Sequence, residues 1–221
     1  CLVSPLDHSV WAYEPLKRVV DRAVVLGFQD ATAMTAPGSL APQDWFSGRI
    51  AWLLHQVDPA RLVVALGGMG YDWNTGDGSR HPVSYAEAMR LASLHEAEVT
   101  FDKTSRNTTF PYFDGVYSHE VWLLDAASAH NELLALLHHN IGGVALWPLT
   151  DADPAIGTLL RTALPVADLG PLVRNVGIGD YVGYEGTGSF QQLLRAARHG
   201  IRSMAVDAAS GLVDDVRYSR I

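Results

Sequence analysis

Four short apolar runs recur along the chain, and segments with helical spacing separate them. The runs are residues 1–4, 23–28, 62–67 and 143–148, and aliphatic side chains dominate them. Unbroken apolar runs of this length are typical of strands covered on both faces, as in parallel sheets. Alternation of such strands with helices favours a parallel sheet with right-handed crossovers. The sequence therefore predicts an α/β fold.

Three helices are expected among these strands. Residues 42–57 place apolar side chains near helical spacing. Residues 84–95 open on Ser84 with a Glu three positions later, which is the pattern of a capping box. Residues 125–140 begin on Asp125, a favourable N-cap, and finish just before a glycine.

Two further segments depart from this alternation. Residues 97–124 contain two strand-like stretches separated by polar residues, which predicts a small antiparallel insertion after the strand at 62–67. Beyond residue 163 the chain becomes rich in glycine, so we expect a unit at 1–163 followed by a linker and a β appendage at 164–221. Residues 189–200 have helix propensity as well, and the choice between helix and strand stays open there.

Composition excludes several classes of partner. The net charge is −8 and the 16 Lys and Arg residues are scattered, which argues against nucleic acid. No apolar run approaches the roughly 20 residues of a membrane helix, and no secretory signal lies within these residues. Cys1 is the one cysteine, so an intrachain disulfide and a thiolate metal cluster are excluded. A chain that opens on Cys1 is expected to be cut from a longer protein.

No metal or organic cofactor is expected. His138 and His139 are adjacent on a predicted helix, so they point about 100° apart and do not form an i, i+4 ligand pair. His119 and Glu120 carry no separate metal pattern. The GGxG stretch at 67–70 resembles a nucleotide loop, but no helix opens directly after it.

Trp147 closes the last apolar run and stands at the expected carboxyl end of a strand. In α/β barrels and open α/β sheets, this end of the strands carries the functional residues. Trp147 could therefore present its indole to a ligand, or it could simply pack in the core.

Four segments, residues 19–30, 36–46, 60–73 and 119–154, together resemble the second half of a family 18 glycoside hydrolase barrel. The similarity extends to spore-germination hydrolases and to a barrel module fused to a polysaccharide deacetylase and a family 2 glycosyltransferase in bacterial multidomain proteins. The resemblance implies the C-terminal half of a (β/α)8 barrel, within a larger multidomain chain. It also implies a polysaccharide or aminosugar oligomer as ligand, and a place on the extracytoplasmic face or cell surface.

The same resemblance implies a set of ligand-binding residues. Trp147 would form the floor of a sugar subsite by stacking on a pyranose face. Gln29 and Asp30 stand where the family has a Tyr and an Asp that position the N-acetyl group, while Tyr71 and Trp73 would line the cleft. Two alternatives stay open, because Asp30 could be a helix cap or loop aspartate and Trp73 could be a hydrophobic lid on the insertion.

The departures from the family pattern bear on catalysis. The acid of the family ends a DxxDxDxE motif, which this sequence lacks, and Gln29 replaces the expected Tyr. No catalytic residue is therefore predicted. The sequence favours a degenerate module that binds N-acetylglucosamine-containing polysaccharide. Two alternatives stay open. The chain could be part of an active hydrolase whose Glu lies outside this chain, or it could be a spacer between catalytic domains.

A half barrel also leaves sheet edges unpaired. We therefore expect either self-association through these edges or an open four-stranded sheet that the C-terminal appendage caps.

Overall fold

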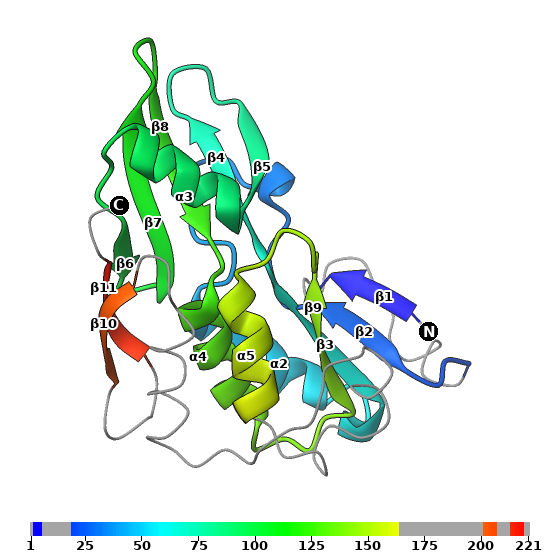
Figure 1. The fold of residues 1–221 in the computed structure, drawn as a ribbon. Coiled ribbons are helices and arrows are strands. Elements are labelled where there is room, and N and C mark those ends of the chain that lie inside the picture. The colour runs from blue at the N-terminus through cyan, green and yellow to red at the C-terminus, as the bar shows by residue number, and fades with distance from the viewer. Residues whose placement is uncertain (1, 6–18, 164–200, 207–212, 219–221) are drawn as a thin grey trace.

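The computed structural model describes residues 2–5, 19–163, 201–206 and 213–218 (Figure 1). They form two sheets. One is parallel and the other is antiparallel, and helices cover both. The mixed α/β class expected from the alternating apolar runs is confirmed.

The parallel sheet consists of the four apolar runs. Its strands are β1 (Leu2–Pro5), β2 (Ala23–Leu26), β3 (Leu62–Gly67) and β9 (Gly143–Trp147), in the order β1-β2-β3-β9. Each neighbouring pair is parallel and in continuous register. Every residue of β3 is buried, which explains why this run has no polar side chain.

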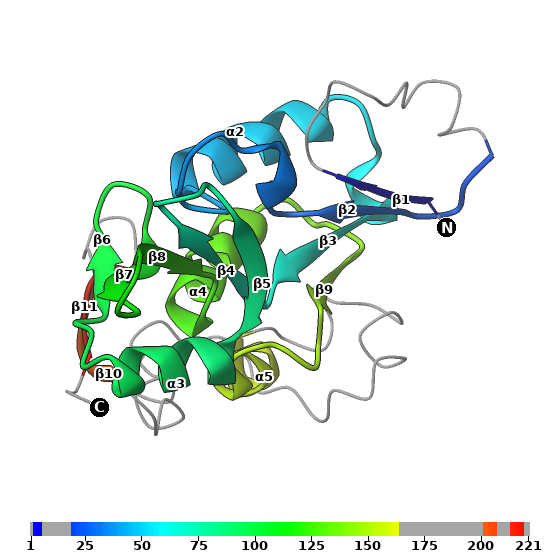
Figure 2. The same ribbon diagram turned by 90° about the horizontal axis from the view of Figure 1, so that it is seen from above.

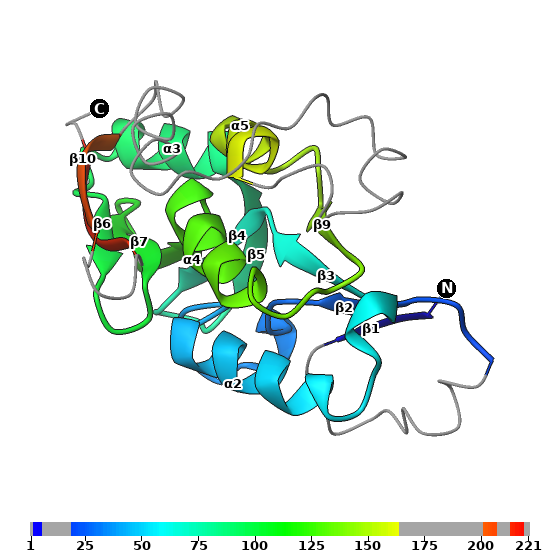
Figure 3. The same cartoon turned by 90° about the horizontal axis from the view of Figure 1, so that it is seen from below.

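Three helices pack against this sheet. They are α2 (Gln43–Leu54), α4 (Ala126–Leu136) and α5 (Pro154–Ala163), and Figure 3 shows α4 between the other two. Two 3-10 turns, η1 (Ala31–Ala33) and η2 (Pro59–Arg61), precede α2 and β3. One apolar cluster joins sheet and helices; its large members include Phe46, Ile50, Leu53, Leu62, Leu66, Leu133 and Ile156.

The antiparallel sheet carries a helix of its own. Its strands are β4 (Met69–Asn74), β5 (Arg80–Ser84), β6 (Thr100–Asp102), β7 (Asn107–Phe113), β8 (Ser118–Leu123), β10 (Ile201–Val206) and β11 (Val213–Tyr218). They follow the order β10-β11-β6-β7-β8-β4-β5. Helix α3 (Tyr85–Leu94) packs on one face through Ala88 and Ala92, which contact Phe110, Val121 and Leu123. Figure 2 shows the two sheets side by side.

The antiparallel region is wider than the expected insertion at 97–124. It begins at Met69, because only Gly68 separates β3 from β4 and β4 pairs with both β5 and β8. Sequence periodicity missed β4 and β5 because they contain Gly, Asp, Arg, His and Pro and lack a continuous apolar run.

The described part of residues 164–221 consists of two strands. Strand β10 pairs with β11, and β11 meets β6 at Arg217 and Thr100. These two strands therefore extend the antiparallel sheet and do not cap the parallel one. Residues 164–200, including the ambiguous segment at 189–200, lie outside the described residues.

Candidate functional site

The carboxyl ends of the parallel strands meet at the side of the sheet that faces the antiparallel region (Figure 1). Trp147 is opposite Gly67 in the register of β9 and β3, and its carbonyl oxygen accepts from Gly68 N at 2.9 Å. The chain leaves β2 through Gly27, whose N–H donates to Ala65 O at 2.7 Å. The residues that follow each strand are thereby brought to one edge.

Trp147 projects from this edge into solvent. Its side chain is 60% exposed, although the strand that carries it begins in the core. Core packing is thus not the role of this indole. An exposed aromatic ring at a strand end offers a large flat apolar surface at a small cost in side-chain entropy.

Glycine at position 68 fixes the loop that follows Trp147. A Cβ at Gly68 would lie 2.6 Å from Ala152 Cβ and 3.0 Å from Pro148 O. The loop therefore packs directly on the junction between β3 and β4, and only glycine fits there without a shift. This close approach explains why residue 68 is glycine. The GGxG pattern taken alone would instead have suggested a nucleotide-binding loop.

Gln29 and Asp30 follow β2 and differ in their contacts. Gln29 is half-buried; its backbone N–H donates to Leu40 O at 2.8 Å and its Nε2 lies 3.4 Å from Ser39 O. Asp30 is exposed, and its Oδ1 accepts from Thr32 N at 2.8 Å and Thr32 Oγ1 at 2.7 Å. Asp30 is therefore the N-cap of η1, which is one of the two alternatives raised by the sequence.

Tyr71 and Trp73 lie on one face of β4, as alternation along a strand requires. Their ring centroids are 6.4 Å apart. Tyr71 is half-buried, whereas Trp73 is only 2% exposed. The Arg80 guanidinium lies 5.0 Å from the Trp73 ring centroid and donates to the carbonyl oxygens of Thr32 and Met34.

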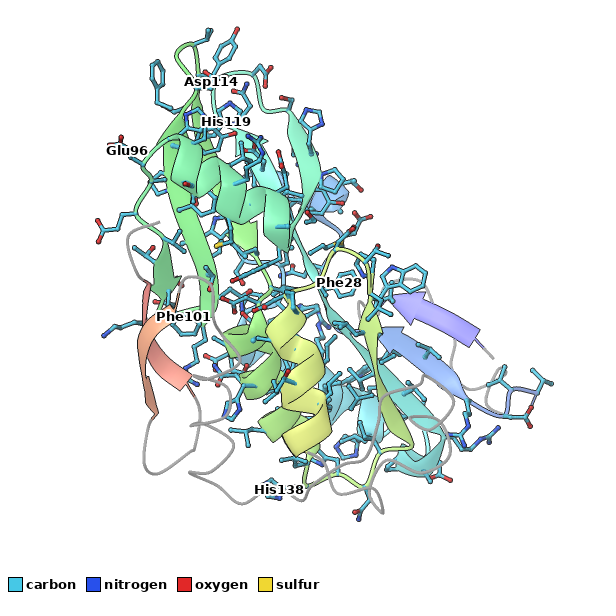
Figure 4. The ribbon with its side chains drawn as sticks, in the orientation of Figure 1. Phe28, Glu96, Phe101, Asp114, His119 and His138 are labelled. Carbon is cyan, nitrogen blue, oxygen red and sulfur yellow. The ribbon has the colours of Figure 1, made fainter. Side chains whose placement is uncertain are left out.

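Because Trp73 is buried, it packs in the interior, which is one of the two roles that the sequence left open. A buried ring does not form an open cleft wall. The ring belongs to a cluster with Phe28, Leu40 and Leu124, against which Tyr71 packs. This cluster joins the loop after β2 to strand β4, and Figure 4 shows Phe28 between the two sheets. Tyr71 and the segment at 28–30 are brought together through it.

Two buried aspartates near the site are structural. Asp153 accepts from Ala155 N at 2.9 Å and from Ala126 N at 3.0 Å, so it binds the first turns of both α5 and α4. Asp125 caps α4 and also accepts from Thr108 Oγ1 at 2.7 Å. Burial raises the pKa of Tyr85, and the negative charges of these two acids add to the effect. Sequence reasoning noticed the cap at Asp125 and missed the double role of Asp153, which only the tertiary contact reveals.

The candidate residues differ in their chemistry. Trp147 is an exposed indole, Gln29 carries an amide and Tyr71 a phenol, and the Asp30 carboxylate already accepts two hydrogen bonds. Among the residues that the structure describes, no group of three His, Cys, Asp or Glu side chains could hold a metal ion. Within the same ranges, no helix is long and apolar enough to cross a membrane.

The sequence matches no family model and no curated protein. Its structure, however, is similar to several solved structures. A chitinase from Chromobacterium violaceum superposes with a TM-score of 0.62 at 21% identity, over 70% of this chain and 51% of that one. The spore cortex-lytic enzyme SleL of Bacillus cereus gives 0.60 at 23% identity, over 70% and 38%. The chitinase ChiW of a Paenibacillus species, described as a cell-surface-expressed multi-modular enzyme, gives 0.55 at 13% identity, over 70% and 21%.

These similarities define the fold of the chain. It has a family 18 glycoside hydrolase-like, chitinase-like fold, as the sequence resemblance predicted. The chain spans about half of the Chromobacterium enzyme and less of the other two. A role in a fused multidomain protein and the assignment of the parallel sheet to half of a closed barrel stay predictions.

Proposed function

We propose that this chain is a carbohydrate-binding module that holds N-acetylglucosamine-containing polysaccharide over Trp147 without cleaving it. The observation that carries this proposal is the exposed indole at the carboxyl end of β9, in a chitinase-like fold. Sugars have CH-rich faces that pack on aromatic rings, and specific hydrogen bonds then fix their orientation.

Polar groups for the sugar would come from the neighbouring strand ends. Gln29 presents an amide, which both donates and accepts, and Tyr71 contributes a phenol from β4. Asp30 is the least free of the three, because one of its oxygens already caps η1. We therefore assign Trp147 the main share of affinity, with Gln29 and Tyr71 supporting it. Trp73 contributes from beneath, by holding Tyr71 and Arg80 in place.

The hydrogen bonds of the acidic residues support the part of the proposal that says this chain does not cleave the polysaccharide. Glycoside hydrolysis needs a carboxylic acid placed to protonate the leaving oxygen. At this edge Asp30 and Asp153 are both engaged by backbone N–H groups. The DxxDxDxE motif is missing from the sequence.

One observation favours a second candidate function. Because the chain spans 51% or less of the three enzymes reported above, other segments of a longer protein could supply the acid. The module would then be the sugar-binding part of an active hydrolase for the same polymer. In either case we propose an extracytoplasmic or cell-surface setting within a larger chain.

Truncation of the indole tests the proposal. Trp147→Ala should weaken binding of N-acetylglucosamine oligomers about tenfold or more in isothermal titration calorimetry, because it removes the stacking surface. Trp147→Phe should retain most of the affinity. Leu149→Ala, at an exposed apolar position in the loop that follows Trp147, serves as the matched control and should bind like wild type. Equal affinity of Trp147→Ala and wild type would contradict the assignment.

A further inference from the structure

A polar cluster that the proposed function does not use lies at the far tip of the antiparallel sheet. It consists of Asp72 on β4, Tyr112 on β7, His119 on β8 and Asp114 in the turn between β7 and β8. We call these four residues the tip cluster. Figure 4 shows Asp114 and His119 together at the upper end of the molecule, well away from Phe28.

His119 lies between two carboxylates. Its Nδ1 is 2.9 Å from Asp72 Oδ1 and 3.1 Å from the Tyr112 hydroxyl, and its Nε2 is 3.4 Å from Asp114 Oδ2. The side chain is only 13% exposed, and Nε2 is buried without a hydrogen bond of good geometry. The Tyr112 hydroxyl in turn donates to Asp72 Oδ2 at 2.5 Å.

The hydrogen-bonding capacity of imidazole decides which form of His119 fits. The proton of Tyr112 is committed to Asp72, so Nδ1 must donate toward Asp72. A neutral ring would then direct the lone pair of Nε2 at the carboxylate of Asp114, which is repulsive. An imidazolium has N–H groups at both nitrogens and satisfies both acids.

Two partners of His119, Tyr112 and Asp114, have shifted pKa values that fix their charge states near neutral pH. Burial and the hydrogen bond to Asp72 raise the pKa of Tyr112, so the phenol keeps its proton. N–H groups of Tyr117 and Val116 lower the pKa of Asp114, with His119 adding to the effect, so that carboxylate stays ionised.

Other titratable or charged groups surround the tip cluster from neighbouring elements. His81 on β5 is opposite Asp72 in register, and Asp77 lies in the turn between β4 and β5. On α3, Glu87 and Arg90 form an ion pair, and both interact electrostatically with Tyr112. The C-cap His95 stacks on Tyr112 with centroids 4.6 Å apart, as does His119 on the other face. Of His81, His95 and His119, it is His119 that lies between two carboxylates.

Asp114 connects the imidazole ring of His119 to the conformation of the turn between β7 and β8. Its Oδ1 accepts from Val116 N and Tyr117 N, each at 2.7 Å, while Oδ2 faces His119. Three exposed apolar side chains, Phe113, Val116 and Tyr117, are displayed by this same hairpin end. We infer that the turn at 114–117 is a proton-dependent latch: protonated His119 holds it to β4, and loss of that proton releases the turn with its apolar side chains.

Hydrogen exchange tests the latch directly. We expect peptides that cover residues 113–118 to exchange about tenfold faster at pH 8 than at pH 5.5, after correction for intrinsic exchange, since loss of the proton removes the charge-assisted contact between His119 Nε2 and Asp114. Peptides from α4 in the same samples provide the internal reference. Equal corrected rates at the two pH values would overturn the inference.

Two variants separate the latch from general stability. Asp114→Asn keeps the Oδ1 acceptor for the turn but places an amide opposite Nε2, so the pH difference at 113–118 should disappear while the turn still forms. His95→Gln removes the other histidine stacked on Tyr112 and should leave the difference unchanged. If Asp114→Asn kept the full pH response, or if only His95→Gln lost it, the proton would act at a group other than His119, which would contradict the inference.

Discussion

At the scale of single residues, Glu132 on α4 is the most unusual side chain in the interior. It is 1% exposed, and neither carboxyl oxygen has a hydrogen-bond partner among the residues that the structure describes. Burial, together with the negative charge of Asp125, raises the pKa of Glu132 well above its ordinary value. The folded protein therefore keeps Glu132 protonated over a pH range in which the unfolded chain has already lost that proton.

This residue predicts a slope in stability against pH. Between the unfolded and the folded pKa of Glu132, the native state holds more protons, so the free energy of unfolding falls as pH rises. Glu132→Gln stays neutral and should remove this part of the slope. Denaturant unfolding at pH 4 and pH 8 checks it: the variant should gain relative to wild type at pH 8. A constant difference between the two proteins across this range would contradict the prediction.

Gly68 gives a second prediction at this scale. Gly68→Ala would place its Cβ against Ala152 and the carbonyl oxygen of Pro148, so the loop after Trp147 must shift. We expect a loss of about 1–3 kcal/mol of stability and weaker oligosaccharide binding. Gly48→Ala is the control: nothing lies within 4 Å of its Cβ in α2, and alanine favours a helix. It should be neutral or stabilising in thermal unfolding, and similar effects of both substitutions would argue against the close-packing account.

At the scale of elements, the sequence was most informative where apolar periodicity decides the structure. The runs at 23–28, 62–67 and 143–148 became β2, β3 and β9, and the cap at Asp125 marked the start of α4. Strand β4 was missed because Gly70, Asp72 and Asn74 interrupt its apolar residues, so it has no continuous apolar run. Side-chain exposure could not be predicted either: Trp147 closes one apolar run and Trp73 follows another, and only tertiary packing buries Trp73 and leaves Trp147 exposed.

Asp153 is the element-level contact that sequence patterns do not reveal. It accepts from the first turns of α4 and α5 at once, so Asp153→Ala leaves N–H groups of two buried helix ends without this partner. We expect a loss of about 1–2 kcal/mol or more in denaturant unfolding. Asp58→Ala removes an exposed cap of η2 and should cost clearly less. Equal losses would show that the bridge between the helices adds nothing.

At the scale of the whole molecule, the sheet topology bears on association. The parallel sheet has the order β1-β2-β3-β9, so in the described residues β1 and β9 are its edge strands. Unpaired edges promote pairing with other chains. The 221-residue chain alone is therefore expected to show a mass above that of a monomer, rising with concentration, in size-exclusion chromatography with light scattering. A monomer at all concentrations would contradict self-association through these edges.

Binding without cleavage is the central claim for the whole molecule. The most direct test is titration of this chain with N-acetylglucosamine oligomers, followed by tryptophan fluorescence, with reducing ends assayed in the same samples. The account predicts a saturable fluorescence change and no release of reducing ends above the level without protein. Release of reducing ends by the chain alone, or no saturable binding, would contradict it.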